Sequence, residues 1–278
     1  MAGQENKEKA TPTAQLVAHM TRTLRKQKGL TQEQLGEMCG FSGAAISGVE
    51  TCAQPASDQM LVKLEEAIGD GMGFFHESRL YVRIDKYPVQ FKDYALVERA
   101  AVNLCLYSTL VVHGLFQTEG YARALIAGGY PILSQERVEE LVDARLARQD
   151  VFDREPPATI ELILEESVLR RLIGSDAVMR DQLTFLAACA EKRNVTVYVL
   201  PLTAGLQGEH AGVYGDINLV ETHEHEHLAY LEPQNESMMI SDPASVSAYA
   251  QRYARMRAQA LPPRESLGLI ERLAGDQQ

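Results

Sequence analysis

Three histidines alternate with glutamates between Glu221 and His227, a segment that reads Glu-Thr-His-Glu-His-Glu-His. If this segment were an extended strand, His223, His225 and His227 would point to one face, where imidazoles could bind zinc, nickel or copper and serve a metal-dependent enzyme or a metal sensor. Alternate strand residues lie roughly 7 Å apart, which is too wide for all three to bind one ion without a bend. We favour the other interpretation, a polar hairpin tip between two strands, and expect no bound metal and no cofactor.

Candidate catalytic residues elsewhere lack the partner groups that catalysis needs. His113 could act as an acid or a base, but no serine or cysteine nucleophile in an elbow motif accompanies it. Glu166 and Arg170 are spaced like an ion pair on one face of a helix. The glycines between 205 and 212 lack the spacing of a phosphate-binding or dinucleotide-binding loop. The sequence therefore predicts a protein that is not an enzyme.

Residues 30–50 suggest a different chemistry, the recognition of DNA. Thr31 and Ser42 are good N-cap residues, and Gln34 stands where it can complete a capping box with Thr31. Gly40 separates two short apolar stripes, formed by Leu35, Met38 and Cys39 and then by Phe41, Ile46 and Val49. Two short amphipathic helices joined by a glycine turn are typical of a helix-turn-helix, which places its second helix in the DNA major groove.

Helices are expected on both sides of this pair. An apolar stripe predicts a preceding helix that ends at Gly29, and its other faces carry Arg22, Arg25, Lys26 and Lys28. A second stripe predicts a helix over 57–68. The sequence therefore predicts an all-α helix-turn-helix domain over 13–70, preceded by a flexible tail at 1–12.

The run Gly29-Leu-Thr-Gln-Glu-Gln-Leu35 resembles the lambda-repressor-like, or XRE-type, helix-turn-helix family, as do Arg25, Gly40, Ile46-Ser47 and Glu50. The resemblance implies that Arg25 and Glu50 form a structural ion pair. It also implies that Gln32 lies at a helix N-terminus beside a DNA phosphate, where the helix dipole favours an anion. The DNA-binding residues implied in this way are Thr31, Gln32, Ser42, Gly43, Ala44, Ser47 and Gly48.

The positions that read bases in that family hold very small residues in this chain. They correspond to Gly43, Ala44 and Gly48, none of which can make the bidentate contacts that Arg, Asn or Gln make to base edges. The helix backbone could approach the bases closely while Ser42 and Ser47 read them, or DNA shape could carry specificity. In the third interpretation the helix-turn-helix is degraded, and the protein is a protein-interaction adaptor.

Composition and charge limit the possible functions. The chain has 278 residues, which suits two domains, and a net charge of −11, which argues against a general nucleic-acid coat. Residues 13–49, however, include four basic residues and only two acidic ones. The four scattered cysteines, the polar N-terminus and the lack of a long apolar run predict a reduced, cytoplasmic protein that does not span a membrane. Since the basic charge is small, we expect homodimerisation to strengthen operator binding.

The rest of the chain mixes helix and strand patterns, after a connector expected at 71–90. The predicted helices are 91–105, 135–150, 168–173, 176–190, 243–261 and 264–273, and the predicted strands are 159–164, 195–200, 213–220, 227–231 and 238–240. Such a mixture predicts an α+β domain over 91–278 with a small, mainly antiparallel sheet.

Residues 110–125, Leu-Val-Val-His-Gly-Leu-Phe-Gln-Thr-Glu-Gly-Tyr-Ala-Arg-Ala-Leu, resemble the signature of the DUF5753 domain of actinobacterial regulators of the Scr1 antitoxin-like type. His113 replaces a proline of the family pattern and Phe116 its second leucine. The resemblance implies a DNA-binding transcriptional regulator whose C-terminal domain senses a partner or ligand and dimerises. It also implies a small DUF397-type protein as a partner. The operator, the effector and the direction of regulation are not given by these residues.

Overall fold

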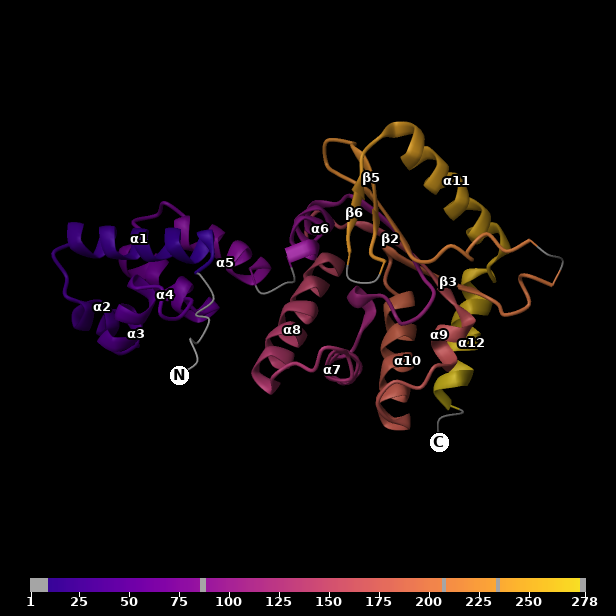
Figure 1. Cartoon of the computed structure of the whole chain (residues 1–278), viewed down its shortest axis with the longest axis horizontal. Coiled ribbons are helices and arrows are strands. Elements are labelled where there is room, and N and C mark those ends of the chain that lie inside the picture. The colour runs from indigo at the N-terminus through magenta and orange to yellow at the C-terminus, as the bar shows by residue number, and fades with distance from the viewer. Residues whose placement is uncertain (1–9, 86–88, 207–208, 234–235, 276–278) are drawn as a thin grey trace, which may run out of the picture. The chain divides into compact units, whose positions relative to one another are not determined.

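The chain forms two compact units, Met1–Val89 and Gln90–Gln278, in a computed structural model that describes residues 10–85, 89–206, 209–233 and 236–275 (Figure 1). Most of the tail expected at 1–12 lies outside these described residues. The first helix begins at Pro12, and Thr11 caps it by accepting a hydrogen bond from the Ala14 amide at 3.2 Å. None of the helices in the described part of the chain is long and apolar enough to cross a membrane.

The first unit is all-α, as the sequence predicts. Its helices are α1 (Pro12–Gln27), α2 (Gln32–Cys39), α3 (Gly43–Glu50), α4 (Asp58–Ile68) and α5 (Phe74–Ile84). Each contributes apolar side chains to one core, in which Leu35, Ile46, Leu61, Leu64 and Phe75 are fully buried. Burial of this shared core, rather than the propensity of such short helices, holds the unit together.

Helix α5 occupies much of the stretch 71–90 that was expected to be a connector. The ring of Phe75 is buried in the core of the helical unit. The N-cap residue of α5 is Gly73, which has no side chain to cap the helix. The Glu65 carboxylate of α4 does so instead, accepting hydrogen bonds from the Gly73 and Phe75 amides at 2.9 and 2.8 Å. Because this cap comes from another helix, local sequence signals did not reveal it.

The second unit is α+β. Its helices are α6 (Val89–Ala100), η1 (Gly114–Phe116), α7 (Glu119–Ala127), α8 (Gln135–Ala147), η2 (Arg148–Phe152), α9 (Glu166–Arg170), α10 (Asp176–Ala190), α11 (Pro243–Gln259) and α12 (Pro263–Gly275). Its strands are β1 (Asn103–Ser108), β2 (Thr159–Glu165), β3 (Val195–Leu200), β4 (Ile217–Glu221), β5 (His227–Leu231) and β6 (Met238–Ile240).

The six strands form one mixed sheet in the order β3-β2-β1-β4-β5-β6, so the expectation of a small, mainly antiparallel sheet is corrected. The two longest registers, β1 with β2 and β2 with β3, are parallel, whereas β4, β5 and β6 extend the sheet as an antiparallel meander. The helix expected from residue 91 includes Leu104 and Cys105, but both residues lie in β1. Without β1 the crossover from β1 to β2 cannot be seen.

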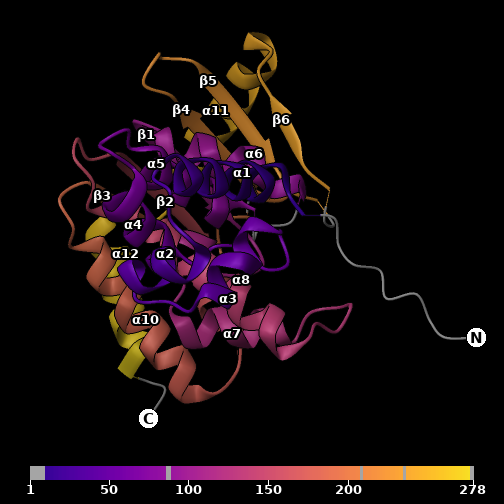
Figure 2. The ribbon, with the colours of Figure 1, turned by 90° about the vertical axis from the view of Figure 1, so that its left-hand side faces the viewer.

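Helix α11 packs on part of one face of this sheet. Tyr253 and Met256 of α11 are buried against Tyr107 of β1 and Ile217 of β4. The alternate strand residues, which point to the opposite face, include the fully buried Leu104, Leu106, Leu162 and Leu164. Figure 1 and Figure 2 both show α11 on one side of the strands and α7, α8 and α10 on the other. The sheet is therefore the middle layer of three.

Buried amide side chains hold the signature segment 112–118 in place. Gln117 donates from its side chain to the Val112 carbonyl at 2.6 Å, and Arg145 donates to the Gln117 side-chain oxygen at 2.8 Å. Gln182 of α10 donates to the Phe116 carbonyl at 2.6 Å and accepts from the Thr118 amide at 2.8 Å. These bonds satisfy backbone groups that would otherwise be buried without a partner, so the signature has a structural role.

Candidate nucleic-acid interface

The helix-turn-helix is built by local capping. Thr31 accepts from the Gln34 amide at 3.1 Å, while the Gln34 side chain accepts from the Thr31 amide at 2.8 Å, which completes the capping box. Gly40 ends α2 in the left-handed conformation, with φ of 74°. Ser42 then caps α3 by accepting from the Ala45 amide at 3.2 Å. Each end of the turn is therefore fixed by residues within the motif.

A glycine inside α2 sets how closely the turn packs on that helix. A Cβ atom added at Gly36 would lie 2.7 Å from the Phe41 carbonyl oxygen and 2.9 Å from the Ser42 carbonyl carbon. Real Cβ atoms do not approach backbone atoms so closely, so any side chain here would push the turn away. Gly36 therefore helps to fix the position of α3, the predicted recognition helix.

The predicted ion pair between Arg25 and Glu50 is present in the structure. Arg25 Nε donates to Glu50 Oε1 at 2.6 Å, and Arg25 Nη2 donates to Glu50 Oε2 at 3.0 Å. The two side chains are 11% and 1% exposed. Burial by itself would raise the pKa of Glu50, but the hydrogen bonds from Arg25 and Gln32 and the charges of Arg25 and Arg22 together outweigh it and hold that pKa below its usual range. Glu50 is therefore a buried, charged acceptor at the end of α3.

Gln32 is the first residue of α2, as predicted, but its side chain has another partner. Its Nε2 donates to Glu50 Oε2 at 2.9 Å. Arg22 also reaches the end of α3, donating to the Glu50 carbonyl oxygen at 2.7 Å. Gln32 and Arg22 thus help to position α3. In the first turn of α2 the Gln34 amide already donates to Thr31, so the amides of Gln32 and Glu33 are the groups suited to a phosphate.

The residues implied as DNA contacts are not equally accessible. Ser42 and Ala44 are exposed, and Ser47 is half-buried. A Cβ atom at Gly43 would lie 3.1 Å from the Cα and Cγ atoms of Glu33, so the start of α3 packs closely on α2. The surface open to a ligand is therefore centred on Ala44, with Ser42 and Ser47 beside it.

Gln54 is a candidate contact that the sequence interpretation missed. A Cβ atom at Gly48 would lie 2.8 Å from Gln54 Nε2 and 3.0 Å from Gln54 Cγ, so this side chain lies directly over α3. Gln54 is exposed and carries an amide, the type of group that can read adenine with two hydrogen bonds. The chain turns back toward α3 at Cys52, whose φ of 56° lies in the left-handed region that favours glycine.

The histidine cluster forms a hairpin tip and not the extended strand that a one-faced metal site would need. Strand β4 ends at Glu221 and β5 begins at His227, which leaves His223 and His225 in the turn. His225 has a φ of 62°, and its Nδ1 lies 2.7 Å from Glu221 Oε1. Among the described residues there is no group of three histidine, cysteine or acidic side chains placed to hold a metal ion.

The other candidate catalytic residues are held in structural contacts. His113 is buried, and its Nδ1 accepts from the Leu115 amide at 3.3 Å. Burial, together with the nearby Arg148 and Arg145, lowers the pKa of His113 well below its usual value, so the ring is neutral. Glu166 accepts from Arg170 Nε at 2.8 Å, which is the helix-surface ion pair that their spacing predicts.

Two family models match the chain. One, described as a helix-turn-helix, covers residues 22–69, and the other, described as a domain of unknown function, DUF5753, covers residues 91–272. Comparisons with curated proteins and with solved structures gave no match. The first match agrees with the capped pair α2–α3, and the second spans the sheet-containing unit and more than half of the chain. The chain therefore belongs to the DUF5753 family and carries an XRE-type helix-turn-helix in front of that domain.

Proposed function

We propose that this protein is a DNA-binding transcriptional regulator that places α3 in the major groove of its operator. The observation that carries the proposal is the helix-turn-helix itself, whose capped helices leave Ser42 at the N-cap of α3 and Ala44 in its first turn exposed. The match of the helix-turn-helix family model over residues 22–69 supports it. A helix with such small side chains can approach base edges closely, and its alanine methyl suits the thymine methyl group.

In this proposal the contacts come from several elements. Ser42 at the N-cap of α3 and Ser47 within α3 donate hydrogen bonds, and the Gln54 amide reaches a base edge from the turn after α3. The first turn of α2 binds a backbone phosphate through its free amides. Since the recognition surface offers few charged groups, DNA shape supplies part of the specificity.

The proposal is tested by an electrophoretic mobility-shift assay at a series of salt concentrations. The probe is the DNA directly upstream of the gene that encodes this chain. Ala44→Glu introduces a negative charge on the open face of α3 and is expected to weaken binding at least about tenfold. The control is His76→Glu on α5, an exposed position on a helix that packs against α1 and α4. Equal affinities of the two variants would show that α3 does not face the DNA.

A protein-interaction adaptor is the second candidate function, and one observation favours it. Glu33 packs against Gly43 at the start of α3, which puts a carboxylate beside the surface that would meet phosphates. An adaptor would bind no DNA at low salt, while circular dichroism would still report folded helices. Salt-dependent binding of the upstream DNA would exclude this alternative.

We further propose that the DUF5753 unit senses a partner or ligand and holds the protein as a homodimer. The reasoning is that a helix-turn-helix with little positive charge gains most from a second copy one DNA turn away, at about 34–36 Å. Light scattering on the full chain and on a 1–89 fragment, which retains α5, tests this arrangement. A monomeric full chain that still binds operator would refute it, and a dimeric fragment would move the interface to the helical unit.

The antitoxin-like role remains part of the proposal, with a small DUF397-type protein as the partner. Its basis is the resemblance of the signature segment to regulators of that type. Co-expression with such a protein, followed by affinity purification and light scattering of the complex, is the direct test. Separate elution of the two proteins would remove this partner from the proposal.

A further inference from the structure

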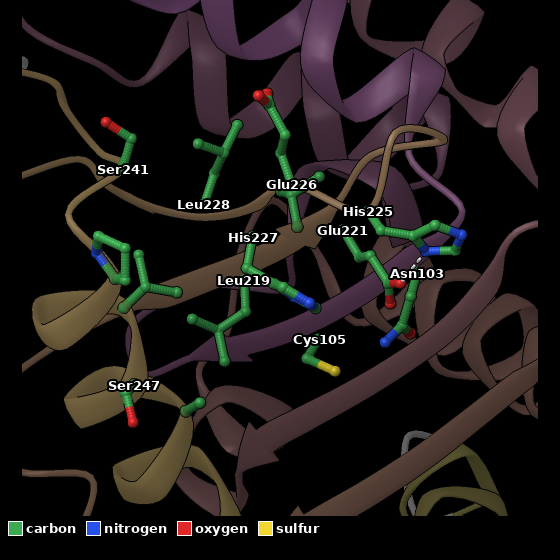
Figure 3. A pocket seen from close by; sticks show the side chains of 14 residues that line it. Asn103, Cys105, Leu219, Glu221, His225, Glu226, His227, Leu228, Ser241 and Ser247 are labelled. Carbon is green, nitrogen blue, oxygen red and sulfur yellow. Dashed lines mark hydrogen bonds and ion pairs between the residues drawn. The ribbon is translucent and has the colours of Figure 1, made fainter.

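An open cavity of about 600 Å³ lies between α11 and the strands β1, β4 and β5 (Figure 3). Its volume falls within the range of small-molecule binding sites. Figure 3 shows Glu221, His225 and Asn103 together at one end of the cavity and Ser247 of α11 on the other side. None of these residues belongs to the proposed DNA surface.

The strand register explains why the floor of the cavity has a polar end and an apolar part. Asn103 pairs with Glu221, and Glu221 pairs with His227, so these three side chains form a polar row across one face of the sheet. A second row lies two residues further along each strand. There Cys105 of β1 pairs with Leu219 of β4, and the two side chains form an apolar row on the same face. A ligand that lies across both rows meets hydrogen-bonding groups at one end and apolar surface at the other.

The cavity exists because α11 covers only part of this face. In the C-terminal half of α11, the side chains of Tyr253 and Met256 fill the space between the helix and the sheet. Nearer its start, the side chains that face the cavity are smaller, namely Val246, Ser247 and Ala250. These small residues leave room above Cys105 and Leu219 and provide one wall of the cavity.

The charged groups around the cavity favour a cation. The hydrogen bond with His225 holds the pKa of Glu221 below its usual value, so Glu221 is ionised at neutral pH. Glu226 also lines the cavity, but its carboxylate points away from Glu221 and Asn103 (Figure 3). Burial raises the pKa of Cys105 to about 11, so its thiol is neutral and forms part of the apolar floor. An anionic ligand would meet the Glu221 carboxylate at the polar end of the cavity, whereas an ammonium group would be attracted to it.

We propose that this cavity binds a small primary amine with an apolar body. The ammonium group donates hydrogen bonds to the Glu221 carboxylate and to acceptors on Asn103 and His227, the three members of the polar row. The apolar body lies over Cys105 and Leu219 and against the wall formed by α11. Such binding would give the sensing unit of the proposed regulator an effector. Only this effector role rests on the proposed function, because binding of the amine itself needs no DNA.

Isothermal titration calorimetry on the full chain without DNA tests the proposal with three probes that share one apolar body. Phenethylamine carries the ammonium group, phenethyl alcohol is neutral, and hydrocinnamate is an anion. The amine is expected to bind roughly tenfold more tightly than the alcohol, and the anion more weakly than both. In Glu221→Gln, the amine should lose about that tenfold advantage while the alcohol binds as before.

A matched pair of variants on α11 locates the site. Ala250→Leu fills the cavity and is expected to weaken the binding of amine and alcohol alike. Ala248→Leu makes the same change at an exposed position that does not line the cavity, and it should leave both affinities unchanged. Circular dichroism on all variants checks that each is folded.

Several results would overturn the proposal. They are the absence of amine binding, equal affinities for amine and alcohol, an unchanged amine affinity in Glu221→Gln, or equal effects of the two leucine variants. Nα-acetyl-lysine amide keeps the side-chain ammonium group of lysine. If it bound more tightly than phenethylamine, the cavity would be assigned to a lysine of a protein partner, and the proposal of a small-molecule effector would be overturned. Loss of DNA binding has no bearing on these outcomes, so a failure of this inference is distinguishable from a failure of the proposed function.

Discussion

Replacing Arg25 by methionine is expected to destabilise the helical unit by about 3 kcal/mol, although methionine keeps much of the apolar volume. The change leaves the Glu50 carboxylate buried, with a side chain only 1% exposed, and removes the two donors at 2.6 and 3.0 Å. Breaking a buried pair in this way costs roughly 3–5 kcal/mol. The lower end applies because Gln32 still donates to Glu50 at 2.9 Å and Arg22 lies 3.7 Å away.

The pH dependence of this destabilisation is a sharper test than its size. In the native protein the pKa of Glu50 is lowered, so its contribution to stability is present above the unfolded value of about 4.3 and is lost as pH falls through the folded pKa. Without Arg25, burial dominates and raises the pKa of Glu50. Protonation then relieves the buried charge, so the stability difference between native and variant proteins should shrink on acidification.

Urea unfolding of the full chain, followed by far-ultraviolet circular dichroism, measures both quantities at neutral pH and at about pH 4. The control is Arg123→Met, which removes an exposed ion pair with Glu139 and should change little. The double variant Arg25→Met, Glu50→Leu should recover most of the lost stability, because an apolar pair replaces the charges. A deficit below about 1 kcal/mol, or an equal deficit at both pH values, would refute this reasoning.

Cys52→Gly should raise the stability of the helical unit by about 0.5–1 kcal/mol, because it relieves a left-handed backbone at φ of 56°; a lower urea midpoint would contradict this. Glu33→Gln should tighten operator binding roughly threefold in low salt, since it removes a carboxylate beside α3; an unchanged retardation profile would place Glu33 away from the DNA. Gln182→Leu should destabilise the DUF5753 unit by about 2–5 kcal/mol, because the Phe116 carbonyl and the Thr118 amide both lose their partner; thermal unfolding with no change would refute the structural role of the signature.

Features set by neighbouring residues could be predicted from the sequence. The capping box of Thr31, the left-handed Gly40 and the cap at Ser42 fix the helix-turn-helix locally. Strand β3 was predicted with its observed ends, Val195 and Leu200, because a β-branched run ends at a proline. The Arg25–Glu50 pair came from the family resemblance, since 25 residues separate the partners and no local signal joins them.

Features set by distant residues could not be predicted in this way. Helix α5 depends on a cap from Glu65, and the parallel part of the sheet depends on β1, whose apolar residues also fit a helix. Gln54 lies over α3 after a chain reversal at Cys52, whose left-handed backbone is rare for cysteine and has no signal in the sequence. The amine cavity depends on which strand residues stand side by side, and the register reveals this.

Glu50 connects the stability of the helical unit to the position of its recognition surface. It is the last residue of α3, and it is bound by Arg25 of α1 and by Gln32 of α2. Its backbone carbonyl also accepts from Arg22 of α1. Small side chains such as Ala44 contact bases only if the whole helix is placed within a fraction of an ångström. In the proposed DNA complex, α3 offers few contacting groups, so we expect operator affinity to depend on this buried carboxylate, which fixes the helix, as well as on the residues that touch the DNA.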